Sequence, residues 1–339
     1  MAAQLKTSGK GRVVSGMRPT GRLHLGHLVG ALENWVPLQD KYDCFYFVAD
    51  WHALTSDYAD TSQLTSFAYD NVADWIGAGL DPEKSTFFVQ SLVPEHAELF
   101  LLLSMVVPVP WLERVPTYKE QQDALKDKDL SSIGFLSYPL LQTADVAIYD
   151  ANFVPVGEDQ VAHLELAREI VRRFNNFFGE SLVEPQPLLT VFKRLPGLDG
   201  DKKMSKSLGN TIHLSDTAED VKKKVMRMYT DPKRIRADIP GTVEGNPVFT
   251  YHDAFNANKA EVDDLKARYR AGKVGDVEVK TKLANALNTH LDPIRERRQA
   301  VLAKPERLKE MLFEGSKRAR VVAEQTMGRV RDAMRIVYR

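Results

Sequence analysis

The chain has 339 residues, of which 43% are hydrophobic and 27% charged, with a formal net charge of zero, and this composition is typical of a globular protein. A single cysteine, Cys44, excludes an intrachain disulfide and fits a reducing compartment. The longest apolar stretch, residues 99–111, is too short to span a bilayer, and residues 1–12 lack the apolar core of a signal peptide. We therefore expect a cytoplasmic protein without a membrane segment.

The first half of the chain alternates strand-like and helix-like segments. We expect strands at 12–15, 44–49 and 86–90, and helices at about 23–39, 61–78 and 98–106. The strand-like runs are apolar throughout, which predicts strands covered on both faces. Helices between such strands indicate an α/β fold with a Rossmann-like, doubly wound parallel sheet, whose ligands bind at the carboxyl ends of the strands.

The second half of the chain changes character after about residue 216, where no strand-like run of similar strength follows. Met327, Val330, Met334 and Val337 repeat at helical spacing, and the two methionines are expected to pack in a core. We predict a catalytic domain at 1–212 and an α-helical region at 213–339.

The two halves also differ in charge. Residues 213–339 hold 27 Lys and Arg against 19 Asp and Glu, and the preceding residues have the opposite imbalance. A basic second half suits contact with a polyanion such as a nucleic acid. A chance distribution of charges over solvated helix faces explains the counts equally well.

The segment 19–27, Pro-Thr-Gly-Arg-Leu-His-Leu-Gly-His, joins the first predicted strand to the first predicted helix. His24 and His27 would lie on one face of the first turn, beside backbone N–H groups that can receive phosphate oxygens. Gly26 leaves room for a flat base to approach the backbone. Taken alone, the two histidines could equally be surface residues near a helix start.

A second motif is Lys203-Met204-Ser205-Lys206-Ser207, in a polar stretch that contains Gly197, Gly200 and Gly209. A flexible loop of this kind can close on a triphosphate, and its ammonium groups then meet the charge that develops on departing pyrophosphate. A pentamer of lysines and serines is, by itself, more often a solvated loop.

Together the two motifs resemble the signature pair of class I aminoacyl-tRNA synthetases. The resemblance implies that an amino acid is activated with ATP, whose phosphates carry Mg²⁺, and is then passed to tRNA. It assigns catalytic roles to His24, His27, Lys203 and Lys206, which act by positioning and charge stabilisation. No metal site built from protein ligands is expected.

The segment 138–145, Tyr-Pro-Leu-Leu-Gln-Thr-Ala-Asp, ends in a carboxylate within an otherwise apolar run. Burial of Asp145 without a partner would be costly, and an indole N–H or a phenol O–H from a ligand would supply one. A local helix cap or a surface salt bridge would also satisfy the carboxylate. Residues 154–160, Val-Pro-Val-Gly-Glu-Asp-Gln, follow with His163 downstream.

These segments resemble the tryptophanyl and tyrosyl subgroup, and the amino-acid sequence at 154–160, 111–114 and 47–55 is closer to that of the tryptophanyl enzymes. Tyrosyl enzymes typically carry a tyrosine where this chain has Val14, so an apolar slot with one acceptor favours indole. The resemblance assigns amino-acid binding to Asp145, Tyr138, Gln142, Gln160, Val14, Met17 and His52. It assigns ATP binding to Arg18, Pro19, Thr20, Gly26, His27, Gly157, Glu158, Asp159, Leu195, Lys203, Met204, Ser205, Lys206 and Ser207.

Some positions depart from the pattern of many bacterial tryptophanyl enzymes, which have Thr and Asn at the places of His24 and His27, Gln at that of Arg18, and Met at that of Gln142. The implied partners are L-tryptophan, ATP, tRNA(Trp) and a second copy of the chain in a homodimer. The helical region would read the anticodon. A tyrosyl-tRNA synthetase and a non-charging paralogue that acts as a binding or regulatory protein remain as alternatives.

Overall fold

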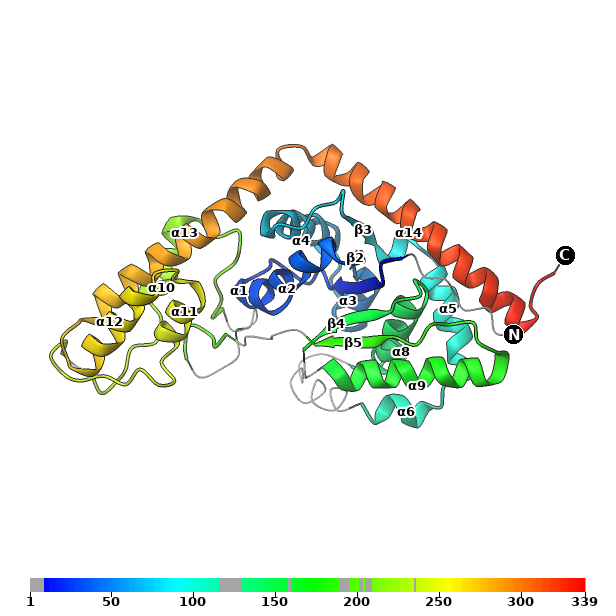
Figure 1. Ribbon diagram of the computed structural model, residues 1–339, viewed down its shortest axis with the longest axis horizontal. Coiled ribbons are helices and arrows are strands. Elements are labelled where there is room, and N and C mark those ends of the chain that lie inside the picture. The colour runs from blue at the N-terminus through cyan, green and yellow to red at the C-terminus, as the bar shows by residue number, and fades with distance from the viewer. Residues whose placement is uncertain are drawn as a thin grey trace.

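The computed structural model describes residues 9–115, 130–157, 160–189, 195–200, 204, 209–234 and 236–338. A layered α/β body occupies one side of the molecule, and a group of helices occupies the other (Figure 1). Two long helices meet at an angle and run along both parts (Figure 1).

Five parallel strands form the sheet, in the order β3-β2-β1-β4-β5. The strands are β1 (Arg12–Met17), β2 (Asp43–Val48), β3 (Ser85–Val89), β4 (Phe153–Val156) and β5 (Gln186–Leu189). The chain leaves β1 toward β3 and then returns to the other side of β1 for β4. This reversal creates a switch point between β1 and β4, which is where doubly wound sheets bind ligands.

Strands β1 and β4 separate almost as soon as they meet. Their only backbone pair in the ladder joins Val13 to Phe153, whereas β1 and β2 pair along six residues. Pro155 in β4 has no N–H to donate, which is consistent with the lack of pairing beyond Phe153. The sheet is therefore open at the carboxyl ends of β1 and β4.

Helices surround the sheet and continue beyond it. Those of the first half are α1 (Leu25–His27), η1 (Leu28–Leu32), α2 (Glu33–Trp35), η2 (Val36–Asp40), α3 (Asp50–Asp57), α4 (Leu64–Ala78), η3 (Gln90–Leu92), α5 (Glu95–Ser104), α6 (Val109–Glu113), α8 (Ile133–Ala147) and α9 (Val161–Phe178). The later helices are α10 (Ala218–Met226), α11 (Pro247–Phe255), α12 (Lys259–Arg270), α13 (Asp276–Leu302) and α14 (Pro305–Met334).

The strands bury both of their faces, as the apolar runs predict. Val13 and Tyr46 belong to a core shared with α4 and α13, and Val14 and Phe45 belong to a second core shared with α5, α8 and α9. Because successive side chains of a strand point to opposite faces, adjacent residues enter different cores. The doubly wound α/β fold expected from the sequence is confirmed.

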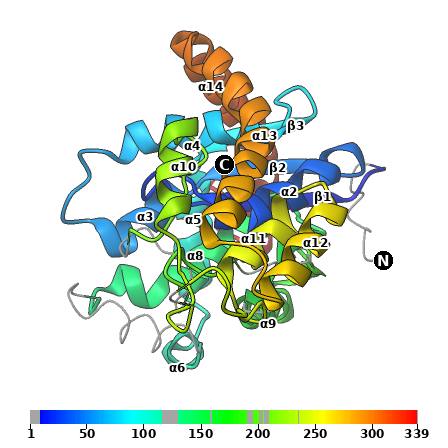
Figure 2. The ribbon, with the colours of Figure 1, turned by 90° about the vertical axis from the view of Figure 1, so that its left-hand side faces the viewer.

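The helical part contains no strand among the described residues after Asp216, as expected. Viewed from this end, α10–α13 stand in front of the sheet (Figure 2). The last helix, α14, returns to the α/β body and packs on β3 and α5. Met327 is fully buried in the second core and Met334 is partly buried against it, which confirms the expected packing of the two methionines. Val330 is also fully buried, whereas Val337 lies beyond the helix end and is 40% exposed.

Several basic residues of α14 bind carboxylates of the α/β body. The ion pairs are Arg320–Glu95, Arg329–Asp150 and Arg331–Glu98. The sequence left open whether these cations meet phosphates or lie on a solvated face. In the structure they attach α14 to α5 and to the turn after α8.

Candidate active site

A cavity of about 430 Å³ lies in the opening between β1 and β4, at the carboxyl end of the sheet. Its size falls in the range of small-molecule sites. Residues of β1, η1, α3, α8 and the start of α9 line it. The fold alone therefore places a binding site at the position where doubly wound sheets have one.

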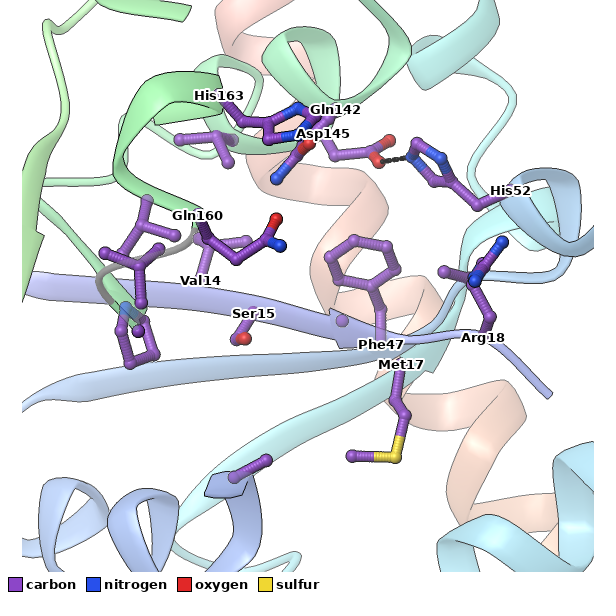
Figure 3. Close-up of a pocket in the computed structure, with 18 of the residues that line it drawn as sticks. Val14, Ser15, Met17, Arg18, Phe47, His52, Gln142, Asp145, Gln160 and His163 are labelled. Carbon is purple, nitrogen blue, oxygen red and sulfur yellow. Dashed lines mark hydrogen bonds and ion pairs between the residues drawn. The ribbon is translucent and has the colours of Figure 1, made fainter. Parts of the chain in front are cut away.

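All the amino-acid-binding residues predicted from the sequence line this cavity: Val14, Met17, His52, Tyr138, Gln142, Asp145 and Gln160. Most of them are labelled in Figure 3, where side chains from several elements converge on one space. Tyr138, Gln142 and Asp145 follow one another along α8 at intervals of four and three residues. That spacing puts the three side chains on one face of the helix.

The walls of the cavity include residues that the sequence analysis missed. Phe47 reaches it from β2 and stacks on Phe88, with 5.4 Å between ring centroids. Its ring lies against Gly16, where a Cβ would come within 2.4 Å of the Phe47 ring. Phe47 stood in the predicted strand without a polar atom to mark it. Gly16 is required because any side chain there would displace the aromatic wall.

Asp145 is 1% exposed and accepts three hydrogen bonds from the protein. His52 Nε2, His96 Nδ1 and Gln90 Nε2 each lie 2.7 Å from its carboxylate oxygens. The protein itself therefore supplies partners for this carboxylate, and its pairing with a ligand N–H or O–H stays a prediction. The partners come from α3, η3 and α5, which are distant in sequence, and nothing in the local pattern around Asp145 identifies them.

The electrostatics of this cluster keep Asp145 ionised. Burial would raise the pKa of the carboxyl, but the charge of His52 and the hydrogen bonds from His52 and His96 outweigh it and lower the pKa to about 2. The cavity thus has an anionic acceptor beside an apolar wall formed by Val14 and Phe47. Such a site suits a ring that is flat, apolar and carries one donor.

The polar end of the cavity is formed where α8 and α9 approach each other. Gln142 of α8 and Gln160 at the N-cap of α9 both line it, and the ring of His163 lies 5.6 Å from that of Tyr138. Amide oxygens and a phenol can accept hydrogen bonds from an ammonium group. These residues are therefore suited to an α-amino group.

His24 and His27 do not line the cavity, and their backbone geometry differs from the expectation. His24 is the N-cap of α1 rather than part of it. Its Nδ1 accepts the N–H of Gly26 at 3.1 Å, and Nδ1 of His27 accepts the N–H of His24 at 3.2 Å. Since an accepting nitrogen carries no proton, each neutral ring has its hydrogen on Nε2. The imidazoles, and not these two N–H groups, would meet an anion here.

Met204 of the second motif lies close to Gly26 of the first motif. A Cβ built on Gly26 would lie 3.6 Å from the Met204 sulfur and 2.9 Å from the His24 ring. The backbone of 212–214 also pairs with that of 23–25, through Leu25 N–H to Ile212 O and Leu214 N–H to Leu23 O, both at 3.0 Å. Two segments about 180 residues apart are thus adjacent, as the resemblance implies for the two motifs.

The remaining residues that the sequence predicts to bind ATP fall into three groups. Arg18 and Gly157 line the cavity, and Arg18 also donates to Ser56 Oγ at 3.4 Å. Pro19 and Thr20 come after β1 and Arg18, while Leu195 is 5% exposed and packs in the same core as Met204. Glu158, Asp159, Lys203, Ser205, Lys206 and Ser207 lie outside the described residues.

Two further properties concern only the described part of the chain. It contains no cluster of three His, Cys, Asp or Glu side chains arranged to hold a metal ion. None of its helices combines the length and apolar content that crossing a membrane requires.

This arrangement has counterparts among known proteins. The sequence profile described as "tRNA synthetases class I (W and Y)" matches residues 6–292. The chain therefore belongs to the class I tRNA synthetases, in the group for tryptophan and tyrosine.

The relatives narrow this assignment. The chain is 50% identical to the tryptophan–tRNA ligase of Thermotoga maritima, over 96% of this chain and 100% of the relative. It is 49% identical to that of Treponema pallidum, over 95% and 96%. The tryptophanyl-tRNA synthetase of Campylobacter jejuni, solved as a complex with ADP and tryptophan, superposes with a TM-score of 0.86 at 34% identity and covers 95% of this chain and 99% of that one. Within its family the chain groups with the bacterial tryptophan–tRNA ligases.

Proposed function

We propose that the chain activates L-tryptophan with ATP and transfers it to tRNA(Trp). The observation that carries the proposal is the anionic acceptor Asp145 in a cavity that has an apolar wall and is also lined by Gly30 and Ala31, just after the first motif. The indole ring would lie against Phe47 and Val14, with its N–H toward Asp145. The α-amino group would meet Tyr138 and Gln142.

The first reaction forms the adenylate. A carboxylate oxygen of tryptophan attacks the α-phosphorus of ATP, a P–O bond forms, and the bond to the β-phosphate breaks as pyrophosphate departs. The Nε2–H groups of His24 and His27 are donors for the phosphate oxygens, and Lys203 and Lys206 would stabilise the charge on the leaving group. Mg²⁺ bound to the ATP phosphates would neutralise further charge.

The second reaction transfers the aminoacyl group. A hydroxyl of the terminal ribose of tRNA attacks the carbonyl carbon of the adenylate, an ester forms, and AMP leaves. Reading of the anticodon falls to the helices of 213–339, of which α10, α11 and α12 lie on the side of the molecule away from α14 and the sheet (Figure 1). The boundary at residue 212 is part of this proposal.

Pyrophosphate exchange with each aromatic amino acid in turn tests the assignment. We expect rapid exchange with L-tryptophan and negligible exchange with L-tyrosine and L-phenylalanine. Exchange that depends on tyrosine alone would mean that the chain is a tyrosyl enzyme. No exchange with any of the three, together with measurable tryptophan binding, would identify a non-charging paralogue.

A homodimer is also proposed, on the evidence of exposed apolar side chains. Leu101, Met105 and Val109, on α5, just after it and on α6, are 52%, 66% and 54% exposed. Apolar residues grouped on a surface mark a contact with another protein. Light scattering coupled to size exclusion should give twice the monomer mass, and Met105→Glu should lower it. We place the enzyme in the cytoplasm, where tRNA charging takes place.

A further inference from the structure

Behind the cavity lies a buried polar group that does not line it. Gln90, His96 and Tyr149 are each 0% exposed, and none of them contacts the cavity. They come from η3, α5 and the turn after α8, and all three surround Asp145 or its neighbour. Burying a polar side chain costs free energy unless its hydrogen bonds are made. Three such side chains beside one carboxylate therefore indicate a role beyond packing.

Two of the three residues, Gln90 and His96, bond one oxygen of Asp145, and Tyr149 bonds His96. Oδ1 accepts from Gln90 Nε2 and from His96 Nδ1, both at 2.7 Å. Among the described residues, Oδ2 pairs only with His52 Nε2, also at 2.7 Å, and His52 itself lines the cavity (Figure 3). A carboxylate oxygen has two lone pairs, so Oδ1 is saturated and Oδ2 keeps one free.

Gln90 is held so that only its donor can face Asp145. Its Oε1 accepts the backbone N–H of Trp51 at 3.1 Å. This bond fixes which end of the amide is oxygen, and the NH₂ group then points to Asp145. The same amide ties the start of α3, which carries His52, to the carboxylate.

His96 is oriented in a similar way by Tyr149. Its Nε2 lies 2.6 Å from the Tyr149 hydroxyl. When the phenol donates its proton to Nε2, the neutral ring carries its hydrogen on Nδ1, which faces Asp145. Phe88 packs against both rings, with centroids 6.1 Å from His96 and 5.2 Å from Tyr149. A chain of two hydrogen bonds therefore runs from the Tyr149 hydroxyl through the His96 ring to Oδ1 of Asp145.

We infer that Gln90, His96 and Tyr149 are specificity-positioning residues: they saturate Oδ1 of Asp145 and leave the free lone pair of Oδ2 as the acceptor for a substrate ring N–H. The inference rests on the proposed function, since it concerns how tryptophan is selected. Loss of one donor to Oδ1 allows the carboxylate to turn. The substrate N–H is then poorly paired, and the advantage of a ring with a donor is lost.

Tyr149→Phe removes one hydroxyl, and a pair of substrates tests its effect. Pyrophosphate exchange is measured with L-tryptophan and with L-3-benzothienylalanine, in which sulfur replaces the ring N–H. We expect kcat/KM for tryptophan to fall about tenfold, while kcat/KM for the analogue changes less than about twofold. A positioning role predicts this difference, because only tryptophan uses the acceptor.

Gln90→Met provides a second variant of similar volume and, unlike Tyr149→Phe, it removes a direct donor to Oδ1. The Trp51 N–H keeps its second acceptor, Asp50 Oδ1 at 3.1 Å. Tyr269→Phe is the matched control, because it removes a buried tyrosine hydroxyl that bonds Asp276 in the helical part of the chain. The control should leave the ratio of the two substrates unchanged, and melting temperatures report any loss of folding.

The possible outcomes separate the two proposals. Equal losses for both substrates in Tyr149→Phe and Gln90→Met, or no loss for either, would overturn the positioning role. Failure of the wild-type protein to use tryptophan at all would instead overturn the proposed function. A selective loss with tryptophan in either soluble variant supports the inference.

Discussion

At the scale of single residues, Asp145 combines a fully buried position with an ionised carboxyl. It stays charged because three neutral or cationic donors surround it, not because water reaches it. The local sequence predicts that this carboxylate needs a partner. The partners themselves were not predictable, since they lie 49 to 93 residues away and meet Asp145 only through the fold.

Removal of the negative charge of Asp145 should abolish the preference for tryptophan over phenylalanine. In Asp145→Asn the amide presents a donor where Oδ1 or Oδ2 had accepted, so either a protein donor or the indole N–H loses its acceptor. We expect kcat/KM for tryptophan to fall by at least about 100-fold, and that for phenylalanine to change far less. Pyrophosphate exchange with both amino acids measures the two values. An unchanged ratio between them would remove Asp145 from substrate selection.

The lowered pKa of Asp145 also predicts a pH dependence of stability. The carboxyl has a pKa of about 2 in the folded protein and an ordinary value of 3.8. Folding therefore favours the ionised form of Asp145. This adds about 2 kcal/mol to the free energy of unfolding above pH 4, and the contribution is lost as the pH falls toward 2. Urea unfolding of wild-type protein and Asp145→Asn should show a difference that shrinks between pH 5 and pH 3. A constant difference over this interval would contradict the assigned pKa.

At the scale of elements, the sheet shows what patterns in the sequence can and cannot reveal. The apolar runs predicted β1, β2 and β3, because each is five or six residues long and buried on both faces. Strands β4 and β5 have four residues each and contain Pro155 and Pro187, so they resemble loops. Yet the gap between β1 and β4 is what makes room for the cavity. The capping role of His24 was equally hidden, because it depends on backbone angles.

The contact of α14 with β3 gives a test at this scale. A Cβ on Gly315 would lie 1.8 Å from the Phe87 carbonyl oxygen, so the helix must move to accept any side chain. We expect Gly315→Ala to lower the free energy of unfolding by more than about 3 kcal/mol. Urea denaturation followed by circular dichroism measures the change.

Gly328 on the same helix is the control. A Cβ there meets nothing within 4 Å. Alanine favours the helix over glycine, so Gly328→Ala should raise the stability by up to about 1 kcal/mol. Similar destabilisation by both substitutions would show that the contact with Phe87 is not the cause.

At the scale of the whole molecule, α13 links the helical part to the α/β body. Arg298 of α13 pairs with Asp74 and Asp70 of α4, at 2.8 and 2.7 Å, in a largely buried site. Burial raises the pKa of Asp74 to about 6 although Arg298 opposes the shift. The sequence predicted a helical second part, but not that α14 returns to the sheet, because the ion pairs and apolar contacts of α14 join residues about 180 to 230 positions apart.

Loss of the Arg298 cation should destabilise the protein in a pH-dependent way. Arg298→Met keeps the apolar stem and leaves Asp74 buried without its partner, at an expected cost of about 3–5 kcal/mol near pH 8. Because the pKa of Asp74 is raised in the folded protein, its contribution to stability is present below the pKa of the unfolded state and is lost as the pH rises. At pH 5 the buried carboxyl is largely protonated and needs no cation, so Arg298→Met should lose less stability there than at pH 8. Thermal melting at the two pH values measures this. A loss independent of pH would exclude Asp74 as the cause.

A crystal structure with a non-hydrolysable tryptophanyl-adenylate analogue tests most directly the claim that one cavity and two distant motifs hold a single reaction intermediate. The account predicts that the indole nitrogen lies within hydrogen-bond distance of Asp145 Oδ2, with the ring against Phe47 and the phosphate beside His24 and His27. An indole ring bound away from Asp145, or a phosphate remote from both histidines, would contradict it.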